Sequence, residues 1–110
     1  VMFANRHIAK DGHECDSLTE KIIDDWLFKR EIEHKRSVPY PGNDRFTCDF
    51  VVEDRWIEFF GLRGEHKRYD ELRKRKLKLV KKLNIKLVEI FPRDVFLKGS
   101  LEKKLEFLQN

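Results

Sequence analysis

The chain has 110 residues, of which 40% are hydrophobic and 40% are charged. This balance predicts a globular domain rather than a disordered chain, and the length allows one hydrophobic core but not two. No segment is long and apolar enough to span a membrane and no secretory signal is visible, so we expect a cytoplasmic protein without a membrane partner. The 24 Lys and Arg residues exceed the 20 Asp and Glu residues, and the net charge of +4 suits a polyanion without requiring one.

Residues 1–16 show no clear periodicity and are expected to form an N-terminal arm, with residues 17–110 as a single domain. Because residue 1 is Val, we expect a processed chain or a part of a longer protein. The arm contains His7, His13 and Cys15, but no second cluster with zinc-ligand spacing accompanies them, so a polar lead-in is the preferred interpretation.

The two cysteines of the chain lie far apart in the sequence, which favours reduced thiols. Abundant Lys and Glu beside a single Gln, Gln109, are a composition typical of thermophile proteins.

A helix is predicted from Ser17 to about Lys29. Ser17 and Glu20 have the spacing of a capping box, in which the Ser side chain accepts an orphan amide of the first turn. Capping alone explains Glu20. However, Glu20 stands three and seven residues before Ile23 and Leu27, so it borders the buried stripe of the helix and could face a site on the sheet.

Residues 32–40 predict a polar edge strand that ends at Pro39 and Pro41. Residues 46–62 predict two further strands, and both carry apolar residues on their two faces. Strands of this kind belong in the middle of a covered sheet.

Asp49 and Glu58 lie inside these apolar strands. Burying an ionised carboxylate there costs free energy unless it binds a cation or a positively charged side chain. If Glu53 and Asp54 form a two-residue loop, counting outward places Asp49 directly opposite Glu58 on the same face. Two such carboxylates can hold one hard divalent cation. A longer loop would shift this register, and the alternative is that one or both carboxylates lie at a strand end in water.

A second helix is predicted from about Glu65 or Tyr69 to Leu83, with Asn84 as a left-handed stop. Lys76 falls in the middle of its apolar stripe, which points the amine inward, although a lysine can also extend along a helix surface.

The loop before this helix is basic, and it either is solvated or contacts phosphate. Residues 85–91 predict a fourth strand, and residues 101–108 predict a short terminal helix.

The ordered set of these motifs resembles the PD-(D/E)xK nuclease superfamily, in particular its small branch of very-short-patch-like and intron-associated nucleases. The similarity covers about residues 11–94. It is carried by the Ser-x-x-Glu entry to the first helix, by Asp49-Phe-Val-Val, by Ile57-Glu-Phe-Phe-Gly-Leu62, by Tyr69 and Lys76, and by the run from Leu87 to Pro92. The family lysine would stand two residues after Glu58, where this chain has Phe60.

The resemblance implies an α/β fold with a restriction-endonuclease-like αβββαβ core, in which helices flank a mixed four-stranded sheet. It also implies a Mg²⁺-dependent DNA endonuclease, with Mn²⁺ as a possible substitute and no organic cofactor, that leaves 5′-phosphate and 3′-hydroxyl ends. The implied metal ligands are Asp49, Glu58, the Phe59 carbonyl and Glu20. Lys76 is expected to supply the catalytic amine from the following helix, as some members of the family do.

Arg45, Arg63, Lys67 and Arg73 are expected to position the DNA backbone, which makes binding sensitive to salt. Two alternatives remain open. One is a Holliday-junction-type resolvase, which would act as a homodimer so that two strands are cut together. The other is a catalytically inactive DNA-binding domain of a larger protein, which Phe60 and the non-Met start suggest.

Overall fold

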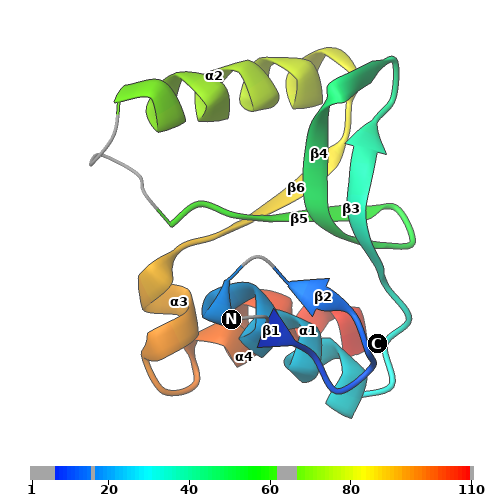
Figure 1. The fold of residues 1–110 in the computed structure, drawn as a ribbon, viewed down its shortest axis with the longest axis vertical. Helices are drawn as coiled ribbons and strands as arrows, with labels where there is room; N and C mark the ends of the chain where they lie inside the picture. Colours follow the sequence, from blue (N-terminus) through cyan, green and yellow to red (C-terminus); the bar gives the residue numbers. More distant parts are fainter. Residues whose placement is uncertain (1–6, 16, 62–66, 110) are drawn as a thin grey trace, which may run out of the picture. The chain divides into compact units, whose positions relative to one another are not determined.

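The computed structural model describes residues 7–15, 17–61 and 67–109. The chain divides into two compact units, one made of residues 1–34 and 93–110 and the other of residues 35–92. Figure 1 shows the helices and strands of each. No helix within the described ranges combines the length and the apolar character that a membrane span needs.

The first unit combines a short hairpin with helices. Its elements are β1 (His7–Ile8), β2 (Glu14–Cys15), α1 (Leu18–Lys29), α3 (Pro92–Phe96), α4 (Ser100–Leu105) and the 3₁₀ helix Glu106–Gln109. The antiparallel β1–β2 hairpin contacts α1. Ile23 and Leu27 of α1 and Leu105 of α4 are fully buried and form the apolar core of this unit.

Helix α1 begins where the capping pattern predicts. The Ser17 hydroxyl oxygen accepts the Glu20 N–H at 3.2 Å, and the hydroxyl lies 3.4 Å from the Glu20 carboxylate. This contact satisfies one amide that the first turn would otherwise leave unpaired. Arg30 ends the helix, and its guanidinium lies 3.2 Å from Glu102 of α4.

The second unit is a four-stranded mixed sheet with one helix. Its elements are β3 (Lys35–Tyr40), β4 (Asn43–Val52), β5 (Arg55–Phe59), α2 (Lys67–Lys82) and β6 (Lys86–Ile90), with the strands in the order β3-β4-β5-β6. The first three strands pair antiparallel, whereas β6 runs parallel to β5 because α2 carries the chain back across the sheet. The predicted α/β architecture and edge strand are confirmed.

The register of the central hairpin follows the prediction. Glu53 and Asp54 form a two-residue loop, and Val52 pairs with Arg55. Glu53 has φ 53°, a left-handed conformation that primed hairpin turns require and that glycine adopts most readily. The hairpin therefore keeps its register at the expense of backbone strain at one exposed residue.

Helix α2 packs on the sheet through its C-terminal half. Leu79 and Val80 contact a buried cluster that includes Tyr40 and Cys48. Asn84 ends the segment with φ 55°, as expected for a left-handed stop. Leu72 and Leu83 are more than a third exposed, so the helix packs on the sheet mainly around Leu79 and Val80.

Several segments differ from the sequence prediction. Strand β3 begins at Lys35 rather than at residue 32, and β4 begins at Asn43 rather than at residue 46. Part of the expected irregular arm pairs as the β1–β2 hairpin, because Gly12, with φ 92°, allows a tight turn before His13. Pro92 starts helix α3 instead of only ending a strand, since proline is favourable in a first helical turn. The terminal helix begins one residue early and continues as a 3₁₀ turn.

We predict that replacing Glu53 with Gly stabilises the protein by about 0.5–1 kcal/mol, because glycine removes the left-handed strain at this position. Urea unfolding measures the change. Asp54→Gly is the matched control: φ is not positive at Asp54, and its carboxylate bonds Lys86 at 3.1 Å, so this change should bring no gain. Equal effects of the two substitutions would contradict the turn geometry.

Candidate functional site

Asp49 and Glu58 converge where the β4–β5 ladder ends. The last register pair is Phe50 with Ile57, and beyond it side chains replace the backbone ladder. Glu58 Oε1 accepts the Asp49 N–H at 3.2 Å, and Asp49 Oδ2 accepts the Phe59 N–H at 2.8 Å. Each carboxylate is therefore tied to the backbone of the opposite strand, which fixes the two acids side by side.

The second oxygen of Glu58, Oε2, has two further donors as neighbours. Lys76 Nζ lies 2.8 Å from Glu58 Oε2, and the Tyr40 hydroxyl donates to the same oxygen at 3.1 Å. The Lys76 amine also donates to the Thr47 carbonyl at 2.9 Å, and only 14% of its side chain is exposed. The amine of α2 thus points into the site, as its place on the helix predicted.

The electrostatics of the pair show that negative charge is crowded at this point. Burial, together with the neighbouring Glu58 carboxylate, raises the pKa of Asp49 to about 7. Burial and the same carboxylate raise the pKa of the Cys48 thiol to about 12, so this cysteine stays protonated. The site is consequently short of positive charge even with Lys76 in place.

A second ion pair lies beside the first and joins α2 to β6. Glu89 is the register partner of Glu58, so the two side chains share a face of the sheet. The Arg73 Nε donates to Glu89 at 3.1 Å, and the guanidinium lies 5.2 Å from the centre of the Phe60 ring. Arg73, expected to contact DNA, is therefore engaged within the protein, and Phe60 fills the family lysine position with a ring that is 3% exposed.

Of the remaining predicted side chains, those of Arg45 and Glu20 lie in the described part of the chain. Arg45 lies exposed on β4, Lys67 begins α2 with its side chain outside the described part, and Arg63 lies outside the described residues. Glu20 is buried in the first turn of α1, in the other compact unit, and its role as a metal ligand stays a prediction.

Tyr40 is a member of the site that the sequence did not indicate. It ends β3, is 1% exposed and stacks on Trp56 with ring centres 5.0 Å apart. Its hydroxyl holds the Glu58 carboxylate, so Tyr40 is a positioning residue. A tyrosine next to a proline at a strand end is common, and only the three-dimensional pairing reveals the contact.

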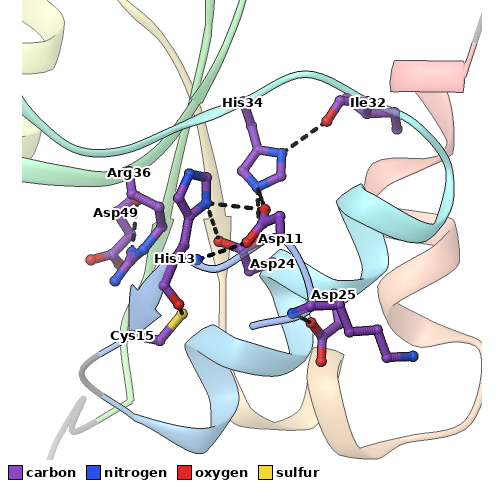
Figure 2. A network of polar contacts seen from close by, with 10 residues as sticks. Asp11, His13, Cys15, Asp24, Asp25, Ile32, His34, Arg36 and Asp49 are labelled. Carbon is purple, nitrogen blue, oxygen red and sulfur yellow. Dashed lines mark hydrogen bonds and ion pairs between the residues drawn. The ribbon is translucent and has the colours of Figure 1, made fainter. Parts of the chain in front are cut away.

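A separate cluster in the first unit could hold a metal ion. It consists of Asp11, His13, Asp24 and His34, whose candidate ligand atoms all lie within 4.8 Å of one another. Figure 2 shows the four side chains pointing toward one another. Burial and the hydrogen bond with Asp11 raise the pKa of Asp24. Of the residues weighed for zinc from the sequence, the cluster contains only His13.

Neither a family model, nor a curated protein, nor a solved structure matches this chain. The resemblance to the PD-(D/E)xK superfamily therefore stays a prediction from the ordered motifs.

We predict that Asp49→Asn stabilises the protein in the presence of a chelator, and that the gain depends on pH. The folded-state pKa of about 7 lies above the ordinary value of 3.8, so the folded state holds the proton more tightly and loses stability as the pH rises from about 4 to 7. The amide removes this loss while keeping an acceptor for Phe59. At pH 8 the gain should be about 2–4 kcal/mol.

The gain should shrink at pH 4 to 5, where the Asp49 carboxyl is protonated in the folded protein. Denaturant unfolding at both pH values measures it. Glu71→Gln, an exposed carboxylate on α2, serves as the control and should change little. A pH-independent effect of Asp49→Asn would contradict the crowding of charge at this site.

Proposed function

We propose that the chain is a Mg²⁺-dependent DNA endonuclease that hydrolyses phosphodiester bonds to 5′-phosphate and 3′-hydroxyl ends. The observation that carries this proposal is the position of the Lys76 amine, 2.8 Å from Glu58 and on the helix that follows the Asp49–Glu58 hairpin. An acidic pair with an adjacent amine is the arrangement that the resemblance implies. In this chain we assign the amine to α2, because Phe60 occupies the position two residues after Glu58 where the family has its lysine.

The donor set fits a hard divalent cation. Asp49 and Glu58 offer carboxylate oxygens, the ligands that Mg²⁺ and Mn²⁺ prefer. Burial and the neighbouring Glu58 carboxylate raise the pKa of Asp49, and a bound dication would offset both effects. When bound, such an ion supplies charge that polarises a phosphate oxygen and makes a nearby water more acidic. The Phe59 carbonyl is a further ligand that the resemblance implies.

Side chains and a backbone amide of the chain would stabilise the developing charge and orient the Glu58 carboxylate. Lys76 can donate a hydrogen bond to the attacking water or to the negative charge that develops on the phosphate. Tyr40 and the Asp49 N–H each hold one oxygen of Glu58, which keeps that carboxylate in one orientation. These fixed contacts support in-line attack, because the acid pair and the amine need little reorganisation before the reaction.

The positive net charge supports a nucleic-acid substrate. The net charge is +4, and Arg45 is exposed on the same strand as Asp49. Contacts of this kind with phosphate carry no sequence information, so we expect binding that weakens steeply with salt.

We predict that Lys76→Met lowers Mg²⁺-dependent DNA cleavage by about 100-fold or more, because the amine that stabilises the developing charge is lost. Lys78→Met on the exposed side of the same helix removes the same charge and should cut at nearly the wild-type rate. Cleavage of plasmid, mismatched, branched and single-stranded DNA measures the rates, and DNA binding is measured in parallel. Equal losses for both variants would show that Lys76 acts only through net charge.

The second candidate is a DNA-binding module without catalytic activity, which the buried Phe60 at the family lysine position favours. Titration with Mn²⁺ separates the two functions. The nuclease requires one or two Mn²⁺ bound in wild type and lost in Asp49→Asn, together with cleavage of at least one DNA substrate. DNA binding without either property would favour the module.

A further inference from the structure

The Asp11–His13–Asp24–His34 cluster joins three segments of the first unit. Asp11 and His13 lie in the turn of the β1–β2 hairpin, Asp24 lies in the middle of α1, and His34 follows the end of α1. The Asp24 side chain is fully buried and that of His34 is 4% exposed. Polar groups this deeply buried need compensating partners.

The cluster places ring nitrogens against carboxylate oxygens at short range. His13 Nδ1 lies 2.9 Å from Asp24 Oδ2 and 3.0 Å from Asp11 Oδ2. His34 Nε2 lies 2.9 Å from Asp24 Oδ1 and 3.0 Å from Asp11 Oδ2. Two imidazole nitrogens and two carboxylates therefore face one common point (Figure 2).

The other nitrogen of His34 fixes which way its ring is protonated. His34 Nδ1 lies 2.8 Å from the Ile32 carbonyl, which can only accept a hydrogen bond, so Nδ1 carries a proton. In the neutral ring Nε2 then carries a lone pair, and this lone pair faces two carboxylates. A ring whose outer N–H is held by a carbonyl is the arrangement that metal-binding histidines adopt.

Asp11 supplies an independent observation. Its Oδ2 atom is buried and has no hydrogen-bond partner among the described residues, although two ring nitrogens lie 3.0 Å away. Both of those nitrogens also lie 2.9 Å from an Asp24 oxygen. A cation between these side chains would therefore give this buried carboxylate a partner of its own.

We propose that Asp11, His13, Asp24 and His34 bind a single Zn²⁺ ion that fastens the hairpin turn to α1. Imidazole ligands favour Zn²⁺ over Mg²⁺, and four protein ligands match the closed tetrahedral shell of a structural zinc site. At zinc–ligand bonds of about 2.0–2.1 Å the ligand atoms would stand about 3.3 Å apart, so each close pair opens by only a few tenths of an ångström. The site is distinct from the oxygen-only pair of Asp49 and Glu58.

The competing arrangement is an ion-pair network in which both histidines are protonated and no metal binds. It would bury an imidazolium at His34 and make Asp11 Oδ2 share the same two ring nitrogens with Asp24. A zinc ion avoids the buried imidazolium and gives each of the two carboxylates its own bond to a cation. It also explains why ligands from the turn, the helix and the segment after it meet, since the cation stabilises only the folded arrangement.

The test is a Zn²⁺ titration of the full chain, without an affinity tag, against a chromophoric chelator at neutral pH. We expect one Zn²⁺ per chain in wild type and also in Asp49→Asn. Binding should weaken by about 100-fold or more in His34→Gln and in Asp24→Asn, because each change removes one of four ligands. Asp25→Asn, the neighbouring carboxylate that bonds the Lys10 amide and Lys21, is the control and should bind as wild type does.

X-ray absorption of the wild-type zinc complex keeps the proposal testable if a variant does not fold. We expect nitrogen and oxygen ligands at about 2.0–2.1 Å and no sulfur at about 2.3 Å, which also excludes Cys15. Removing the zinc should lower the Tm by several degrees. Absence of stoichiometric binding, binding unchanged in His34→Gln, or sulfur ligation would overturn the proposal.

Discussion

The crossed hydrogen bonds of Asp49 and Glu58 are the constraint on which the candidate active site depends. Each carboxylate accepts an amide of the opposite strand just beyond the last ladder pair. The strands can part there without leaving those amides unpaired. The two carboxylates are held side by side, with Glu58 buried and Asp49 half-buried. The Lys76 amine and the Tyr40 hydroxyl both contact the other oxygen of Glu58, Oε2.

The two compact units carry clusters of different chemistry. The pair in the sheet unit offers oxygen ligands and an amine, which suits a hard cation and a phosphate substrate. The cluster in the first unit offers two imidazoles and two carboxylates, which suits a borderline cation in a closed shell. Under our two proposals one ion takes part in the reaction, while the other stabilises the hairpin turn on α1.

The sequence predicted the elements of the sheet unit because its signals are local. A two-residue loop at Glu53 fixes the register by counting, and helical periodicity alone points Lys76 inward. Tyr40 and the Asp11 cluster could not be predicted in the same way. Apart from the neighbouring pair Asp11 and His13, their partners lie 10 to 23 residues apart in the sequence, and no spacing rule connects a turn, the middle of a helix and the segment after it.

Crystals soaked with Mn²⁺ would test the central claim most directly, through the anomalous signal of the ion. Our account predicts a peak within bonding distance of both the Asp49 and Glu58 carboxylates, with the Lys76 amine still directed at the same point. A site without a peak there, or a Lys76 side chain turned toward solvent, would contradict it.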